Sequence, residues 1–508
     1  MSKIKAIFFS TILIMAFFFI FKNKDDFFQK KEIKQEIKQE TKKKISLPSS
    51  MYISELTTLR ENIHGKPKNS LVIGTLVNIL KTEKNWIYIS TDKSNYKGWI
   101  EKKYLTEVKL KDKNIFETIK ILTDIPIDKD TNEVKDTVEN NSEQKFIKKM
   151  IDTDFDIKEL YQLGDVQFKS INKKLYKNNP KGDIKAIYIS LNGMYHVDDY
   201  IKLAKKTNIN AFVLDIKNDH GRVLFESPIA LEVLGDSYIR PRIKDMKTFI
   251  KKLKKNNIYL VGRISTFKDE AYAISNKSDV ILDKRYNKAY QSSDKIPWLS
   301  AYNRNAWYYN VELAKEAADF GFNEILFDYV RFPDRVQNLE KNSKLIYNNI
   351  YSETKVEVIQ RFLKYAHDEL SEKEVYTAAS VFGQIGISKT DENIGQHWET
   401  ISNVVDFINP MAYPSHYAKG TYGLKNPDNN PFILLNNYTK DVILRNNNLE
   451  NPAIIETWIQ GFSAPWIKNH RSYKKEELIE QIRALKVEGL NSYLVWNASS
   501  RYYWDGLK

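Results

Sequence analysis

Eight short apolar runs, separated by helix-patterned stretches, constrain the fold of this chain more than any other feature. They lie within residues 181–508 and read KAIYISLNG, NAFVLDIKND, IYLVGRIST, EILFDYVRFP, VYTAASVFG, VDFINPMAYP, AIIETWIQG and SYLVWNAS. Their many β-branched residues are typical of strands buried on both faces of a parallel sheet. The stretches between them, such as 311–320, 356–370 and 475–487, have the apolar spacing of helices that cover such a sheet. The alternation predicts an α/β fold.

Two α/β architectures fit this alternation, a closed TIM-type (β/α)8 barrel and a doubly wound open sheet. A nucleotide-binding doubly wound sheet carries a glycine-rich phosphate turn after its first strand, whereas this chain reads SLNGMY over residues 190–195. Eight strands are also the number that closes a TIM-type barrel. We therefore expect residues 181–508 to form a (β/α)8 barrel.

The amino-terminal segment predicts export. A 16-residue apolar run at 6–21 follows Lys3 and Lys5, and no small-x-small cleavage site comes after it. This pattern favours an uncleaved hydrophobic anchor helix within residues 1–22, with a cleaved signal peptide and a buried core helix as alternatives. We expect a single-pass cell-membrane protein with extracytoplasmic domains, or a secreted protein if the signal is cleaved.

Three segments of different composition follow this run. Residues 29–44 are nearly all charged or amide side chains, so residues 23–50 predict a stalk, and residues 109–180 predict a linker with partial helix. Residues 51–108 alternate apolar and polar positions between Gly and Asn breaks, which predicts a small all-β barrel of about five strands.

The pieces of 51–108 resemble a bacterial SH3-like domain, and WIY at 86–88 and GWI at 98–100 carry the likeness. The resemblance implies a module that binds cell-wall peptides or glycans, with Trp86, Tyr88 and Trp99 lining a groove. Ordinary core packing is the alternative, and for Trp99 we favour it.

The composition removes several classes of function. The chain has no cysteine, which excludes disulfides, thiolate metal sites and cysteine nucleophiles. Its seven histidines are scattered without an H-x-x-x-H spacing, so we expect no metal and no cofactor. Lys and Arg exceed Asp and Glu by 79 to 65. We interpret this excess as a solvated surface rather than a nucleic-acid groove, because the barrel lacks a basic stripe interleaved with aromatic residues. Attraction to an anionic wall polymer or membrane surface stays open.

Candidate site residues lie where the predicted strands end, since chemistry in such barrels lies at the carboxyl ends. Asp328 follows the apolar Ile-Leu-Phe of the fourth strand. A carboxylate there must be solvated, paired or used, because burying an isolated charge is costly. Arg331, three residues on, is the expected partner, and a purely structural Asp328–Arg331 ion pair is the alternative.

Other strand ends offer further polar and aromatic side chains. Asp215 and Lys217 share one face of the second strand, and Glu456 and Trp458 share one face of the seventh. The remaining candidates for substrate binding are Arg263, Asn409, Tyr413 and Trp496. Carboxylates and amides that bond hydroxyls, together with aromatic rings that face C–H groups, are what a sugar requires.

Five segments of the barrel region read GFNEILFDYVRFP, DIKND, GQHWE, NPMAYPSHY and WNAS. Together they resemble a bacterial family described as “putative glycosyl hydrolase domain”, and the likeness extends over nearly all of 181–508. It implies a glycosidase-type barrel at the cell surface. Two positions depart from the family pattern: Ser380 stands where an Asp commonly precedes Val-Phe-Gly, and Glu456-Thr-Trp replaces Arg-Pro-Trp. The departures put the identity of the acid in doubt.

We therefore predict hydrolysis of a glycosidic bond in a cell-surface or wall polysaccharide, such as a peptidoglycan-type glycan. Two carboxyl groups must flank such a bond, one protonated and one ionised. Asp328 is the expected nucleophile or base, Glu456 the leading acid and Asp215 the reserve. Arg331 and Lys217 would tune these carboxyls. A non-catalytic glycan-binding or scaffolding protein on the same barrel is the alternative, and another barrel chemistry is a third.

Overall fold

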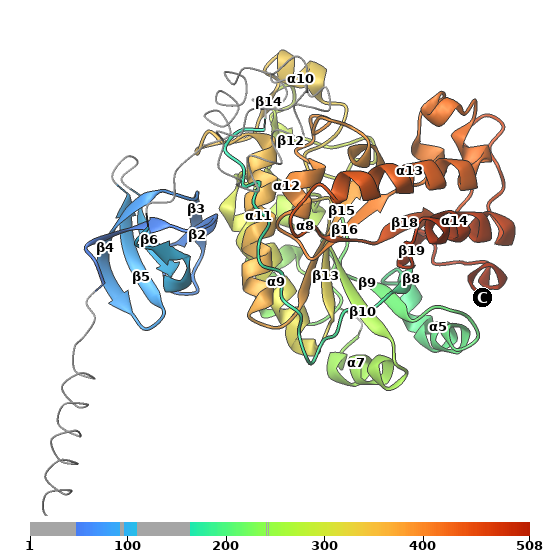
Figure 1. Ribbon diagram of the computed structural model, residues 1–508, viewed down its shortest axis with the longest axis horizontal. Coiled ribbons are helices and arrows are strands. Elements are labelled where there is room, and N and C mark those ends of the chain that lie inside the picture. Colours follow the sequence, from blue (N-terminus) through green and yellow to red (C-terminus); the bar gives the residue numbers. More distant parts are fainter. Residues whose placement is uncertain (1–46, 92–95, 109–162, 240, 242) are drawn as a thin grey trace, which may run out of the picture. The chain divides into compact units, whose positions relative to one another are not determined.

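The computed structural model describes residues 47–91, 96–108, 163–239, 241 and 243–508. Within them the chain forms an all-β region followed by an α/β barrel with helices around its strands (Figure 1). The predicted anchor helix, nearly all of the stalk and most of the linker lie outside the described residues. In the part of the chain that is described, no helix has the length and apolar character needed to span a membrane.

The all-β region contains seven short strands rather than the expected five or so. They are β1 (Ser50–Ile53), β2 (Thr57–Arg60), β3 (Pro67–Leu71), β4 (Leu76–Glu83), β5 (Trp86–Thr91), β6 (Lys97–Glu101) and β7 (Leu105–Thr106), in the sheet order β3-β2-β6-β5-β4-β1-β7. Trp86 is buried, which agrees with core packing, while Tyr88 and Trp99 are half-buried with ring centroids 5.3 Å apart. The likeness to SH3-like domains stays a prediction.

The eight apolar runs form the eight parallel strands of a closed barrel, as predicted. These strands are β8 (Lys185–Ile189), β9 (Ala211–Lys217), β10 (Tyr259–Ser265), β13 (Glu324–Asp328), β15 (Tyr376–Phe382), β16 (Phe407–Met411), β18 (Thr457–Gln460) and β19 (Tyr493–Trp496). They pair in the order β15-β13-β10-β9-β8-β19-β18-β16, and the pairing of β15 with β16 closes the ring. A two-residue strand, β17 (Ile454–Ile455), extends the edge of β16.

Helices connect the strands, and the three stretches with helical patterning are confirmed. The helices are α5 (Val197–Ala204), α6 (Pro228–Leu234), α7 (Met246–Lys255), α8 (Glu270–Ser275), α9 (Arg304–Phe320), α10 (Gln337–Lys341), α11 (Lys355–Ser371), α12 (Trp398–Ser402), α13 (Pro431–Asn446) and α14 (Lys475–Val487). A small sheet of β11 (Leu282–Asp283), β12 (Lys288–Ala289) and β14 (Leu345–Ile346) joins the segments that follow β10 and β13.

Two apolar cores follow from the alternation of side chains along each strand. One fills the barrel interior and includes Ala211, Val213 and Val261, and the other lies between strands and helices and includes Phe212 and Leu214. Asp215, two residues after Val213, therefore has the parity of an inward-facing residue at the carboxyl end of β9.

The chain just before β8 covers the amino ends of the strands. The Tyr176 amide donates to the Tyr376 hydroxyl at 3.2 Å, and the Asn179 side chain donates to the Asn323 carbonyl at 2.7 Å. Both partners lie at the starts of strands β15 and β13. Because this end is occupied, the opposite end of the barrel is the one available for a site.

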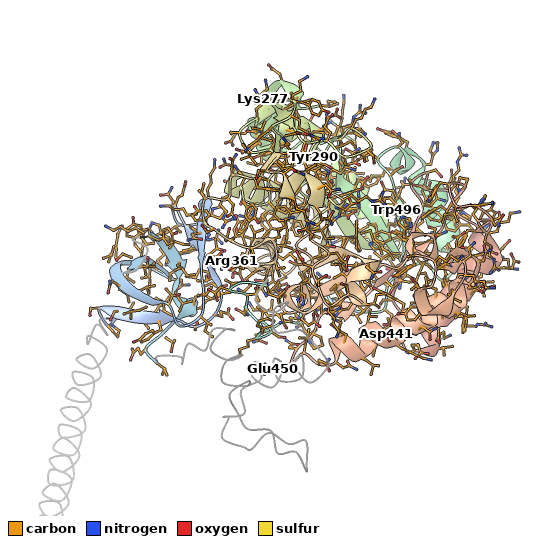
Figure 2. All side chains as sticks on the ribbon, turned by 90° about the horizontal axis from the view of Figure 1, so that it is seen from above. Lys277, Tyr290, Arg361, Asp441, Glu450 and Trp496 are labelled. Atoms are coloured by element: carbon orange, nitrogen blue, oxygen red, sulfur yellow. The ribbon has the colours of Figure 1, made fainter. Side chains whose placement is uncertain are left out.

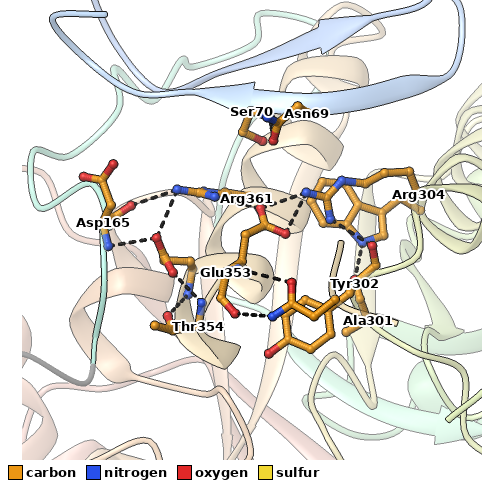
Figure 3. Close-up of polar contacts among 12 residues, drawn as sticks. Asn69, Ser70, Asp165, Ala301, Tyr302, Arg304, Glu353, Thr354 and Arg361 are labelled. Carbon is orange, nitrogen blue, oxygen red and sulfur yellow. Dashed lines mark hydrogen bonds and ion pairs between the residues drawn. The ribbon is translucent and has the colours of Figure 1, made fainter. Parts of the chain in front are cut away.

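A buried ion cluster fixes the two helices that follow β10 and β13 (Figure 3). Arg304, the first residue of α9, donates from Nη2 to both Glu353 oxygens at 2.8 Å, and Arg361 of α11 donates to Glu353 Oε1 at 2.7 Å. Thr354 and Glu357 form a capping box at the start of α11. The strand ends that these helices follow carry Arg263 and Asp328.

Candidate active site

Two adjoining cavities open at the carboxyl ends of the barrel strands. One has a volume of about 370 Å³ and is lined by Asp328, and the other has a volume of about 460 Å³ and is lined by Asp215. Arg263, Tyr329 and Trp496 line both cavities, and Trp496 is labelled in Figure 2. The shared wall makes the two cavities parts of one cleft across the barrel mouth.

Arg263 holds the two aspartates on one guanidinium group. Its Nε and Nη2 donate to Asp328 Oδ2 at 2.8 and 2.7 Å, and its Nη1 donates to Asp215 Oδ1 at 2.7 Å. The other oxygen of Asp215 accepts from the Tyr188 hydroxyl at 2.6 Å, and the other oxygen of Asp328 accepts from the Tyr329 amide at 2.7 Å. Both carboxylates are therefore fully hydrogen-bonded at the junction of the cavities.

Burial and charge act differently on the members of this cluster. Burial raises the pKa of Asp215, although Arg263 and the Tyr188 hydroxyl oppose the rise. Burial alone lowers the pKa of Arg263, but Asp328 and Asp215 together raise that pKa well above its ordinary value. The guanidinium is therefore permanently charged, and Asp215 is a carboxyl group that gains a proton more readily if it loses contact with Arg263.

The backbone is strained immediately after Asp328. Tyr329 has φ of 49°, a left-handed conformation that is unfavourable for a bulky residue. The conformation places the Tyr329 ring near the guanidinium carbon of Arg263, 5.9 Å from its centroid, and lets its amide bond the Asp328 carboxylate. Such strain persists where the surrounding contacts enforce it, and it is concentrated at functional sites.

Aromatic side chains form one wall of the cleft. Trp458, Tyr413 and Trp496 line the cavity that Asp328 also lines. The Trp458 indole nitrogen donates to the Ser380 hydroxyl at 3.2 Å. Ser380, which stands where the family pattern commonly has an Asp, therefore orients this ring. The Trp458 and Trp496 rings meet edge to face at 5.6 Å.

The expected Asp328–Arg331 pair is wrong. Arg331 instead donates to the Phe332 carbonyl at 2.8 Å and lies 3.4 Å from Asp334, with its guanidinium 4.3 Å from the centroid of the Phe382 ring. The left-handed turn at Tyr329 separates the directions of the two side chains. Arg331 still lines the cavity with Asp328.

The expectation that Lys217 shares a face with Asp215 is also wrong. The pairing register shifts so that Arg263 lies opposite Asp215 while Ile264 lies opposite Lys217. This β-bulge reverses the alternation, because one extra residue turns the next side chain to the other face. Lys217 is fully buried outside the barrel interior and pairs with Asp269 beneath the Tyr309 ring.

Glu456 and Asn409 face the interior, but neither lines the cleft. Both are fully buried, with Asn409 Nδ2 donating to Glu456 Oε2 at 3.1 Å. Glu456 lies two residues before Trp458, and Asn409 lies two residues before Met411, and both of these later residues line the cleft. Two residues span about 6.6 Å along a strand, so Glu456 and Asn409 lie deeper in the barrel. Burial raises the pKa of Glu456 to about 8. The prediction that Glu456 lies at the barrel mouth is therefore wrong, because the side chain lies deeper, although it does face the barrel interior as predicted.

Sequence reasoning missed Tyr188 and Tyr329. Tyr188 lies two residues after Ala186, on the inward parity at the end of β8, and this spacing was the available signal. The conformation of Tyr329 left no trace in the sequence pattern. Among the described residues no group of three or more His, Cys, Asp or Glu side chains could hold a metal ion.

One protein family and several solved structures are similar to this chain. No curated protein matches the chain. A hypothetical protein from Ruminiclostridium thermocellum ATCC 27405 is 31% identical, with 38% of this chain and 96% of that chain covered and a TM-score of 0.32. The PgaB (BpsB) glycoside hydrolase domain from Bordetella bronchiseptica is 13% identical, with 63% and 95% covered and a TM-score of 0.46. Alpha-L-fucosidase isoenzyme 2 from Paenibacillus thiaminolyticus is 11% identical, with 64% and 48% covered and a TM-score of 0.42. Residues 186–502 match the family described as “Putative glycosyl hydrolase domain”, and the chain belongs to this family.

Proposed function

We propose that the barrel hydrolyses a glycosidic bond in a cell-surface or cell-wall polysaccharide. The observation that carries this proposal is the pair of carboxyl groups, Asp328 and Asp215, held on Arg263 where two aromatic-walled cavities meet. Glycosidases use two carboxyl groups on either side of the bond to be cleaved. The half-buried Trp496 ring supplies a face on which a sugar ring can stack, and the buried Trp458 ring supports it edge to face.

Asp328 is the proposed nucleophile or base. Its oxygens accept from two guanidinium nitrogens and one backbone amide, which fix the orientation of the carboxylate. In this role Asp328 attacks the anomeric carbon or removes a proton from the attacking water. The positive charge that develops on the sugar ring is stabilised by the same carboxylate.

Asp215 replaces Glu456 as the proposed acid. Burial raises the pKa of Asp215, and substrate that separates it from Arg263 removes an interaction that lowers this pKa. The proton then passes from Asp215 to the leaving oxygen as the glycosidic bond breaks. Water supplies the hydroxyl group to the sugar and the proton that restores Asp215.

A non-catalytic glycan-binding role is the second candidate, and one observation favours it. Arg263 forms ion pairs with both carboxyl groups, and only 8% of Asp328 and 2% of Asp215 are exposed. A site built solely for binding would keep this closed arrangement and use the aromatic wall. Turnover distinguishes the two roles.

The test is an assay of new reducing ends on peptidoglycan sacculi, glycol chitin and hydroxyethyl cellulose. We expect Asp328→Asn to abolish turnover while the melting temperature stays within a few degrees, because the amide keeps the shape and Arg263 keeps Asp215. Asp199→Asn, a change of an exposed aspartate on α5, serves as the control. Unchanged turnover in Asp328→Asn refutes the assignment, and polymer binding without turnover in either protein supports the binding role.

We also propose that the barrel acts outside the cytoplasm and that residues 51–108 contact the wall. The apolar run at 6–21 behind Lys3 and Lys5 supports export, since positive charge stays on the cytoplasmic side. A cytoplasm-only reporter fused after Lys508 should be inactive. Retention of binding to purified cell wall by a protein lacking 51–108 contradicts the second part.

A further inference from the structure

An aromatic strip continues from the cleft onto the surface of the loop after β18. Tyr413 and His416 line the cleft, and their rings contact Phe462 with centroids 5.7 and 6.2 Å away. The Phe462 ring in turn stacks on Trp466 at 6.2 Å with an interplanar angle of 26°. A row of rings therefore leads from the candidate active site to an outer residue of the loop.

Trp466 is exposed to an extent that core packing does not explain. Its relative accessibility is 65%, and it is the only exposed one of the nine tryptophans, all of which lie in described parts of the chain. Exposing an indole ring costs free energy in proportion to its apolar area. An exposed ring that continues a row of rings from a cleft forms a contiguous apolar surface, which is typical of a binding site.

The loop that carries Phe462 and Trp466 is anchored at both ends. Asp428, which is 1% exposed, accepts from the Gln460 side chain at 3.2 Å and from the Arg471 amide at 2.9 Å. The Gln460 amide group also donates to the Phe462 carbonyl at 3.0 Å. Anchors before and after the aromatic pair hold its position, which reduces the entropy lost when a ligand binds.

We propose that Phe462 and Trp466 form an outer sugar subsite, at which the protein holds a polysaccharide chain beyond the bond to be cleaved. The occupant is a pyranose unit of a β-linked polymer, whose flat C–H face suits the exposed indole ring. This inference rests on the proposed glycoside function and adds that the substrate is a long chain. A disaccharide that occupies the cleft does not need the outer ring.

The experiment measures affinity for glycol chitin and hydroxyethyl cellulose by affinity electrophoresis, and for chitobiose and cellobiose by calorimetry. We expect Trp466→Ala to weaken binding of the preferred polymer about tenfold while disaccharide affinity is unchanged. Trp466→Phe should recover most of the loss because it keeps a stacking ring. Tyr286→Ala, which removes another exposed ring from the turn between β11 and β12, should behave like the parent.

Tryptophan fluorescence gives a second measurement, since the exposed indole should shift to shorter emission wavelength when polymer covers it. The shift should be smaller in Trp466→Ala, in which only the cleft tryptophans remain to respond. The proposed subsite is refuted if Trp466→Ala binds polymer as tightly as the parent protein, or if the parent binds neither polymer. If polymer binding depends on Trp466 but the protein shows no turnover, the subsite is supported and the proposed hydrolysis is refuted.

Discussion

Glu456→Gln should make the stability of the barrel less dependent on pH. Glu456 is fully buried, its Oε2 accepts from Asn409, and its Oε1 has no hydrogen-bond partner among the residues that the structure describes. Burial raises the pKa of Glu456 to about 8 from the ordinary 4.5, and burial together with Glu456 raises the pKa of Glu324 well above its usual value. The native barrel therefore holds a proton on Glu456 at neutral pH.

The sign of the effect follows from which state binds the proton. Between pH 4.5 and about 8 the folded chain keeps this proton while the unfolded chain releases it, so the free energy of unfolding falls as pH rises. One proton corresponds to a slope of about 1.4 kcal/mol per pH unit, and over the whole interval to at most about 5 kcal/mol. Glutamine is neutral at every pH and removes this contribution.

The assay is urea unfolding at several pH values between 5 and 8.5, followed by tryptophan fluorescence, because seven of the nine tryptophans lie in the barrel. We expect the parent and Glu456→Gln to have similar stability near pH 5 and the variant to be the more stable protein at pH 8. Glu232→Gln, at an exposed position on α6, is the control. Parallel plots of unfolding free energy against pH for parent and Glu456→Gln would refute a protonated Glu456.

Two further changes test Asp215 in the cleft and the buried ion cluster between α9 and α11. Tyr188→Phe removes the hydroxyl group that lowers the pKa of Asp215. The alkaline limb of a plot of kcat/KM against pH should therefore move to higher pH. A shift to lower pH contradicts Asp215 as the acid. Glu353→Gln leaves Arg304 and Arg361 facing each other without the intervening negative charge. The change should lower the free energy of unfolding by about 3–5 kcal/mol, measured by urea unfolding. A loss below about 1 kcal/mol would contradict the buried ion cluster.

The barrel and the location of its site could be predicted because they depend on local patterns. Buried parallel strands require apolar runs of a certain length, and each of the eight runs contains a strand of the barrel. The carboxyl ends of those strands meet at one end, so Asp328, Asp215 and Arg263 could be placed there before their contacts were known.

The partners of the charged residues could not be predicted from spacing along the chain. Asp328 pairs with Arg263 on the neighbouring strand, where the register sets Ser265 opposite Asp328, and not with Arg331 three residues on. The left-handed conformation of Tyr329 and the bulge in β9 each redirect one cation. Gly262 allows the bulge, because a Cβ atom at this position would collide with the Ile216 side chain.

Depth in the barrel decides the chemistry of a carboxyl group more than parity does. Asp328 and Glu456 both face the interior, yet one is held by a guanidinium at the cleft and the other lies a layer below with an amide as its neighbour. In the deeper layer burial raises the pKa of Glu456 to about 8, and at the cleft Arg263 opposes the effect of burial on the pKa of Asp215. A carboxylate at the cleft can stabilise positive charge on a sugar, and a carboxyl group in the deeper layer can reach no substrate. Arg263 therefore determines which carboxyl groups at the mouth of this barrel are available for chemistry.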